Sequence, residues 1–242
     1  MDAIKTVNLT KIYKTLIAVD KLNLTIKQGE IFSLLGVNGA GKTTTIRMLS
    51  CLAKPTSGTA FVEGNCIIKN TAEVKNCIGV SPQETAVAPN LSVRENLELI
   101  CRIYGLSSDK CAAKIHELTE LFGFREILDK KAGKLSGGWK RRVSIAMGLI
   151  SEPKVLFLDE PTLGLDVLAR SELWNLIRNL KGKATIVLTT HYMEEAEALS
   201  DRIGIMNCGK LLVTGTAGEL MNMTQSNNLE NAFISIVREA QR

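Results

Sequence analysis

A glycine-rich segment that follows an apolar run most constrains how this chain of 242 residues can fold. Residues 36–44 read Gly-Val-Asn-Gly-Ala-Gly-Lys-Thr-Thr, which fits the pattern G-x-x-x-x-G-K-[ST]. The apolar run at residues 31–35 precedes the segment, and Ile46, Leu49 and Ala53 follow it at helical spacing. A strand, a glycine loop and a helix in this order predict a phosphate-binding loop in an α/β protein.

The positions of this loop predict how it holds a nucleoside triphosphate. Glycines allow backbone N–H groups to surround the phosphates, and the N-terminus of the following helix adds a favourable dipole. We expect Lys42 to reach the β- and γ-phosphates, the Thr43 hydroxyl to bind Mg²⁺, and Thr44 to bond the α-phosphate. The other predicted phosphate contacts are Gly36, Asn38, Gly39, Ala40 and Gly41.

The composition limits the class of protein. Apolar residues make up 45% of the chain, which suffices for one domain or one domain with a subdomain. No apolar stretch approaches the ~18 uncharged residues of a membrane span, and residues 1–5 lack the apolar core of a signal peptide. We therefore expect a protein that is soluble by its own sequence and free to bind a membrane protein. Six scattered cysteines without a C-x-x-C pair favour reduced thiols, and two histidines exclude a histidine-rich metal site.

The positive charge of the chain is concentrated in one segment. The net charge is +5, and residues 125–142 alone carry seven basic and two acidic residues, which equals the whole surplus. Two interpretations stay open, a solvated surface and a positive rim near bound phosphates. A nucleic-acid surface is disfavoured because few aromatic residues are available there for base stacking.

Strand and helix patterns alternate along most of the chain. Segments 59–63, 77–81, 155–158 and 185–188 predict strands. Leu173, Leu176, Ile177 and Leu180 predict a helix between the last two. This alternation predicts a mostly parallel sheet covered on both faces, preceded by an antiparallel β region in residues 1–35, where residues 22–26 alternate.

A mostly helical insert interrupts this α/β pattern. Ser92 and Glu95 predict a capping box opening a helix with Val93, Leu97, Ile100 and Tyr104 on one face. A second helix carries Ile115, Leu118 and Phe122 and ends at Gly123, and a C-terminal docking helix carries Leu229, Phe233, Ile236 and Ala240. We thus expect a P-loop NTPase core with a mostly parallel sheet, an N-terminal antiparallel β region and an inserted helical subdomain. The expected divisions of this single domain are an α/β core at 1–83 and 153–215, a helical subdomain at 84–152 and a helical tail at 216–242.

Two further segments carry candidate chemistry. The apolar run 155–158 ends in Asp159 and Glu160. An acidic residue at such a strand tip is the usual partner of Mg²⁺ beside a phosphate loop, and Glu160 is then placed to orient or deprotonate an attacking water. Ser136-Gly137-Gly138 at a predicted helix start forms a second anion cradle, although taken by itself this segment is better explained as an ordinary helix cap.

Together these motifs resemble the ATP-binding subunits of ABC transporters over nearly the full length of the chain. The matching segments are 36–44 (Walker A), 155–160 (Walker B), 135–139 (the signature L-S-G-G-Q), 163–166 (D-loop), Gln83 (Q-loop), His191 (switch histidine) and Tyr13 (an aromatic that stacks on adenine). Trp139 departs from the glutamine of the signature, and Val167 from the proline common after the D-loop.

The resemblance implies a mechanism that needs two copies. In that family two ATPase units meet head to tail, and ATP with Mg²⁺ lies between Walker A of one and the signature of the other. Residues 136–138 and Asp166 then contact the partner's nucleotide, while Glu160 and His191 act in hydrolysis with Lys42. Gln83 is implied to bind at the Mg²⁺ site and to couple it to the helical insert.

The implied partners are an integral membrane permease subunit and a second ATPase subunit, identical or paired. The implied location is the cytoplasmic face of the cell membrane, with no nucleic acid bound. Three segments resemble the branch of this family that exports drugs, sodium or antimicrobial peptides, namely residues 90–97, 201–203 and 229–233. Polysaccharide and lipid exporters share these sequence features. The transported substrate is determined by the membrane subunit, whose sequence is separate from this one.

Other classes fit less well. A GTPase requires an N-K-x-D segment, which the chain lacks. DNA-repair ATPases of the superfamily usually insert a coiled coil or zinc cysteines, and translation factors usually fuse two ATPase units. The alternative that stays open is a superfamily ATPase acting on a non-transport partner associated with nucleic acid or the ribosome.

Overall fold

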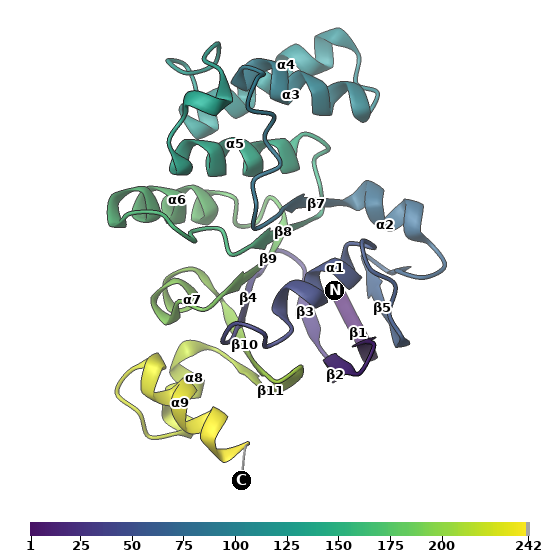
Figure 1. Ribbon diagram of the computed structural model, residues 1–242, viewed down its shortest axis with the longest axis vertical. Coiled ribbons are helices and arrows are strands. Elements are labelled where there is room, and N and C mark those ends of the chain that lie inside the picture. Colours follow the sequence, from purple (N-terminus) through teal and green to yellow (C-terminus); the bar gives the residue numbers. More distant parts are fainter. Residues whose placement is uncertain (241–242) are drawn as a thin grey trace.

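The computed structural model describes residues 1–240 and places two β-sheets at the centre of the protein (Figure 1). The larger sheet has the strand order β11-β10-β4-β9-β8-β7. All neighbouring pairs in it are parallel except β10 and β11. Its strands are β4 (Ile31–Leu35), β7 (Ile78–Ser81), β8 (Val155–Asp159), β9 (Thr185–Thr190), β10 (Arg202–Asn207) and β11 (Lys210–Gly215).

Helices cover both faces of this sheet, which explains why β4, β8 and β9 are buried along their whole length. In Figure 1, α6 and α7 lie on one side of the sheet, and α1 and α2 on the other. These helices are α1 (Lys42–Leu49), α2 (Thr71–Cys77), α6 (Val167–Asn179) and α7 (Met193–Leu199). The predicted mostly parallel sheet between two helical layers is therefore confirmed.

The second sheet is antiparallel and is built mainly from the N-terminal segment, as predicted. Its strands are β1 (Asp2–Tyr13), β2 (Leu16–Leu22), β3 (Thr25–Lys27), β5 (Ser57–Val62) and β6 (Asn65–Cys66). The alternation predicted over residues 22–26 appears in the burial, since Leu22, Leu24 and Ile26 are buried and Asn23 is exposed, but the segment is not one strand, because the chain leaves β2 after Leu22 and enters β3 at Thr25. The Thr6 hydroxyl bridges the break between β2 and β3, because it donates to the Leu22 carbonyl and accepts from the Leu24 N–H.

Between β7 and β8 the chain forms the helices drawn at the top of Figure 1. They are α3 (Val93–Ile103), α4 (Ser108–Phe122), the short 3₁₀ helix Ala132–Lys134 and α5 (Gly137–Leu149). Ser92 and Glu95 form the predicted capping box, and Gly123 ends α4 with φ 71°. The predicted inner face of α3 was partly wrong. Val93 and Leu97 are buried, but Cys101 completes that face, while Tyr104 is exposed.

The C-terminal segment forms α8 (Ala217–Met223) and α9 (Leu229–Glu239), which pack on each other beside α7. Leu229, Phe233 and Ile236 of α9 are buried as predicted, whereas Ala240 is exposed. Residues 241–242 of the predicted tail lie outside the described residues. Within residues 1–240, every helix is too short or too polar to cross a membrane.

Candidate nucleotide-binding site

The phosphate loop joins β4 to α1 in a conformation that only glycine accommodates at Gly41. Gly41 has φ 102°, and a Cβ atom there would lie 2.4 Å from the Ala18 carbonyl oxygen. The N-terminus of α1 has no side-chain cap, so its first N–H groups remain free to bind an anion. The loop therefore has the backbone geometry that the sequence predicted for a phosphate cradle.

The ammonium group of Lys42 is buried inside this loop. Lys42 is only 5% exposed, and its Nζ donates to the Gly36 carbonyl at 2.7 Å and the Val37 carbonyl at 3.2 Å. The same Nζ lies 3.3 Å from Oε1 of Glu160. The loop thus holds a cation at its centre, and the tip of β8 supplies the neighbouring carboxylate.

Thr43 and Asp159 bring oxygen ligands together beside the loop. The Thr43 hydroxyl donates to Oδ1 of Asp159 at 3.0 Å, and the Thr189 hydroxyl donates to the same oxygen at 2.5 Å. Asp159 is 5% exposed. Hydroxyl and carboxylate oxygens suit Mg²⁺, which commonly takes one or two carboxylates and completes its shell with phosphate oxygens and water. The residues present therefore fit the ion.

Glu160 and His191 form a hydrogen-bonded pair at the ends of adjacent parallel strands. Oε2 of Glu160 lies 2.7 Å from Nδ1 of His191. Glu160 has φ 49°, an uncommon conformation for a residue other than glycine, and its N–H donates to both the carbonyl and the hydroxyl oxygen of Thr189. The end of β9 therefore holds Glu160 in a strained backbone conformation that directs its side chain toward Lys42 and His191.

Lys42, Thr43, Glu160 and His191 border a hollow of about 680 Å³, and Asp159, bonded to Thr43, does not line it. Gln83, Glu160, Leu163 and His191 form one part of its wall, and the β1–β2 hairpin forms another. Sequence reasoning placed Tyr13 here but missed Leu16, Ile17, Ala18 and Cys208, whose positions depend on pairings between strands. The residues lining the hollow are Tyr13, Leu16, Ile17, Ala18, Asn38, Gly39, Ala40, Gly41, Lys42, Thr43, Thr44, Gln83, Glu160, Leu163, His191 and Cys208.

The signature segment lies elsewhere in the same chain. Ser136 caps α5, with its Oγ accepting from the Trp139 N–H at 3.5 Å, and Ser136 and Gly137 are exposed. None of residues 136–138 lines the nucleotide hollow, and neither does Asp166, which caps α6 by accepting from Ala169 N–H. The structure therefore brings the Walker A, Walker B, Gln83 and His191 positions together with Leu163 of the D-loop, but leaves the signature positions and Asp166 apart from them.

Trp139 is anchored within the helical insert. Its ring lies 6.3 Å from that of Phe124, and the Arg142 guanidinium lies 4.5 Å from its centroid. Arg142 also pairs with Glu172 of α6. The residue that departs from the family pattern thus packs against its own chain.

The basic segment 125–142 contributes no side chain to the nucleotide hollow. Arg125 is an exposed partner of Glu120, which agrees with a solvated surface. Arg141 behaves differently, because it is 5% exposed and its two terminal nitrogens donate to the carbonyls of Pro82 and Gln83, each at 2.6 Å. Sequence reasoning missed this contact between α5 and the Gln83 loop.

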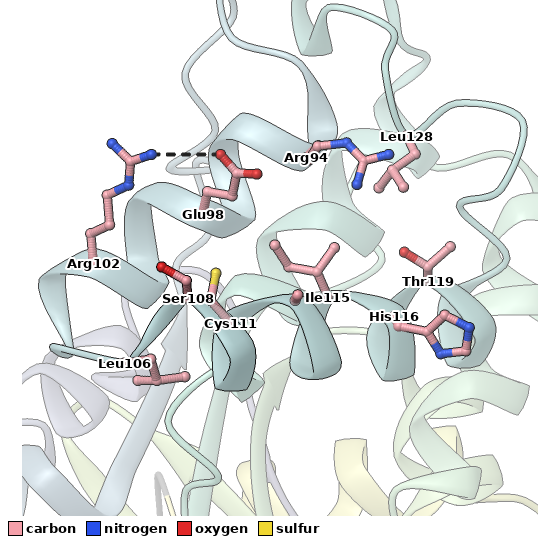
Figure 2. Close-up of a pocket in the computed structure, with 11 residues that line it drawn as sticks. Arg94, Glu98, Arg102, Leu106, Ser108, Cys111, Ile115, His116, Thr119 and Leu128 are labelled. Atoms are coloured by element: carbon pink, nitrogen blue, oxygen red, sulfur yellow. Dashed lines mark ion pairs between the residues drawn. The ribbon is translucent and has the colours of Figure 1, made fainter.

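A second hollow of about 500 Å³ lies between α3 and α4, away from all of these residues (Figure 2). Arg94, Glu98 and Arg102 of α3 border it, and Figure 2 shows Ile115 and Thr119 of α4 on the opposite side. It contains none of the predicted site residues.

The fold and the site define a nucleotide-binding protein with a phosphate loop, and comparison with known proteins gives its family. Residues 19–163 match the family model described as ABC transporter, and the chain belongs to this family as an ATP-binding domain. It is 40% identical over 224 residues to the daunorubicin resistance ATP-binding protein DrrA3 of Streptomyces coeruleorubidus, covering 92% of this chain and 70% of that protein.

Other relatives are much longer than this chain. Human ATP-binding cassette sub-family A member 2 is 44% identical over 227 residues, which are 91% of this chain but only 9% of that protein. Among solved structures, an ATP-binding subunit of an ABC transporter superposes with a TM-score of 0.86 at 26% identity, covering 97% of this chain and 99% of that one. The dimeric cassette MJ0796, bound to ADP and phosphate, superposes with a TM-score of 0.79 at 28% identity, covering 88% and 98%. The predicted ABC ATPase fold is confirmed.

Proposed function

We propose that this chain is the ATP-binding subunit of an exporter, in which it hydrolyses ATP within a head-to-tail dimer and drives a separate membrane subunit. The observation that carries this proposal is the contact of buried Lys42 and Glu160 with each other and with His191, beside the Thr43–Asp159 pair. Four of these side chains, from three separate segments, line one hollow, which is far more than a structural phosphate site needs.

The proposed binding roles follow from the geometry. Lys42 and the free N–H groups of α1 hold the phosphates, and the exposed ring of Tyr13 stacks on the base at the hairpin edge of the hollow. Thr43 and Asp159 hold Mg²⁺, with Gln83 on the adjoining wall. When bound, Mg²⁺ neutralises charge on the phosphate oxygens.

Glu160 is the proposed general base. Its Oε2 accepts a hydrogen bond from His191 Nδ1–H, and this bond orients the carboxylate toward the hollow. The carboxylate then takes a proton from a water molecule positioned for attack on the γ-phosphate, and Lys42 stabilises the negative charge that develops on that group. His191 is half-exposed on the wall of the hollow, where its imidazole is available to the γ-phosphate.

A dimer completes the proposed site. The exposed N-terminus of α5 offers Ser136 and the Gly137 and Gly138 backbone to an anion outside its own chain. Val167 and Leu168, which follow Asp166, are both 77% exposed. Apolar side chains with such exposure next to an unused anion cradle are what a subunit interface requires, and the relative MJ0796 forms a dimer.

The membrane subunit is proposed to bind the helical insert. A hollow of about 400 Å³ lies between this insert and the α/β core, lined by Leu52, Ile100 and Tyr104 among others. Ile103, on the same helix, is 69% exposed. We place a cytoplasmic helix of the permease there, with residues 84–152 moving as a subdomain against the core at 1–83 and 153–215. The chain then lies on the cytoplasmic face of the membrane and binds no nucleic acid.

The test is the oligomeric state and phosphate release of the Glu160→Gln variant. The amide retains the shape of the side chain but cannot accept a proton, so we expect MgATP to convert the variant from monomer to dimer while turnover is lost. Light scattering and a phosphate-release assay measure both, with the exposed Glu126→Gln as a matched control. Hydrolysis at the wild-type rate by monomeric Glu160→Gln protein contradicts both the base and the dimer.

A further inference from the structure

The buried carboxyl group of Glu195 joins the two segments that carry Glu160 and His191. Glu195 has no exposed surface and lies in the first turn of α7, four residues after His191. Its Oε1 accepts hydrogen bonds from the Thr162 hydroxyl at 2.8 Å and from Trp174 Nε1 at 3.2 Å. Thr162 is itself fully buried and lies two residues after Glu160. One carboxyl group thus ties the turn after Glu160 to the helix after His191.

A packing role alone does not account for an acid at this position. Within the described part of the chain, Oε2 of Glu195 is buried and has no hydrogen-bond partner. Burial raises the pKa of Glu195 above its usual value and the charge of Glu160 adds to the rise, while the neighbouring Thr190 hydroxyl and the bonds from Thr162 and Trp174 lower it. A leucine or methionine would fill the same volume without these costs.

The contacts around Glu160 show what Glu195 adds. On one side, the N–H of Glu160 is bonded to Thr189 at the end of β9. On the other side, the Leu163 N–H donates to the Glu160 carbonyl, and the next restraint along that turn is the Thr162–Glu195 bond. Without Glu195 the strained Glu160 backbone keeps only the Leu163 bond on that side.

We propose that Glu195 is a positioning residue that fixes the distance between Glu160 and His191 by holding Thr162 and the first turn of α7 together. This role rests on the proposed hydrolytic function of that pair. Glu195 does not line the nucleotide hollow, so it acts on the reaction only through Glu160 and His191. A misplacement of about 1 Å in a reacting group lowers a rate by about 100-fold, so even a partial loss of this restraint is measurable.

Steady-state kinetics give the first test. In Glu195→Leu we expect kcat to fall at least about 10-fold with KM for ATP nearly unchanged, because the binding groups are untouched. Glu195→Gln is expected to stay within about 3-fold of wild type, because its amide oxygen accepts the same two hydrogen bonds. Glu194→Gln is the matched control, since Glu194 is the preceding residue and its side chain is 82% exposed.

A double-mutant cycle separates this role from general destabilisation. Thr162→Val removes the same hydrogen bond from the opposite side at similar volume, so it provides a variant if Glu195→Leu folds poorly. We expect Thr162→Val to lower kcat and to add almost nothing in the Glu195→Leu background. Additive effects of the two substitutions would overturn the proposal.

Histidine NMR gives a readout that does not depend on turnover. The chain has only two histidines, and His116 lies on α4 beside the second hollow, where it serves as an internal reference. We expect the imidazole ¹⁵N signals of His191 to shift in folded Glu195→Leu and Thr162→Val, and those of His116 to stay in place. Unchanged His191 signals in either folded variant would overturn the proposal. Shifted signals in a chain without ATPase activity would retain the positioning role and refute the proposed function instead.

Discussion

The phosphate loop and the signature segment are both glycine-rich helix N-termini, yet their surroundings are opposite. At the first, Lys42 is 5% exposed and the loop is pressed against the Ala18 carbonyl. At the second, a Cβ atom on Gly137 would meet nothing closer than a Leu165 methyl carbon at 3.9 Å. The loop is enclosed by its own chain and faces the carboxylates of Asp159 and Glu160 at the tip of β8, whereas the signature segment presents only donors to open space. One chain therefore contains an enclosed phosphate loop and a separate open segment, which the proposed dimer places against a second molecule.

The largest expected effect is at the enclosed site. Lys42→Ala removes the buried cation that faces Glu160 and the proposed β- and γ-phosphates. Loss of one member of a buried charge pair costs several kcal/mol, so we expect ATP affinity to fall about 100-fold. Titration with a fluorescent ATP analogue measures this, with the exposed Lys21→Ala as control. Retained affinity in Lys42→Ala would show that the loop does not bind the phosphates.

Gly137→Asp tests the signature segment without touching the loop. The space around Gly137 is open, and an acidic residue in the first turn of α5 is favoured by the helix dipole, so the variant should fold with stability at or slightly above wild type. The added carboxylate repels the partner's γ-phosphate, and we expect kcat to fall about 100-fold while each monomer binds ATP normally. Thermal unfolding, nucleotide titration and phosphate release measure the three quantities.

A mixture of the two variants tests the proposed head-to-tail arrangement. A heterodimer of Lys42→Ala and Gly137→Asp contains one site with both an intact loop and an intact signature segment, and one site with neither. We therefore expect the mixture to recover activity that each variant lacks alone. An inactive mixture, in which the two variants still associate, contradicts the head-to-tail arrangement.

Much of the enclosed site was predictable because its geometry is local. Gly41 must be glycine for its positive φ, and Asp159 follows an apolar run that forms a strand buried along its whole length. Long-range polar contacts were missed. Arg141 bonds carbonyls 58 and 59 residues away, and Glu195 bonds Thr162 33 residues away. A lone polar residue in a helix carries no periodic signal for such a partner.

The apolar face of α3 shows a similar limit. Val93, Leu97, Ile100 and Tyr104 share helical spacing, but burial follows Val93, Leu97 and Cys101 instead. Both sets fit a period of 3.6, and the choice between them depends on where α4 and α5 pack, which is a tertiary property. Spacing alone therefore predicted the helix but not its inner face.

Tyr13 tests the base end of the enclosed site, where a smaller effect is expected. One face of its ring lies 4.9 Å from Lys11 Nζ, and the residue borders the nucleotide hollow. Stacking on a base contributes about 1–3 kcal/mol, so Tyr13→Ala should weaken ATP binding about 10-fold, and Tyr13→Phe should restore it. Equal losses for ATP and for inorganic triphosphate would exclude stacking, because triphosphate has no base.

The smallest effect is expected at Trp139, where the comparison turns on stability instead of nucleotide binding. Trp139→Gln restores the residue that the family usually carries, but it removes the contacts with Phe124 and the Arg142 guanidinium. Aromatic and cation–π contacts of this kind contribute about 0.5–1.5 kcal/mol each, so we expect the free energy of unfolding to fall by about 1–2 kcal/mol in urea titrations. ATP binding by the monomer should not change, because Trp139 does not line the hollow. A rise in MgATP-dependent dimer formation in Trp139→Gln, measured by light scattering, would instead assign Trp139 a direct role at the subunit interface.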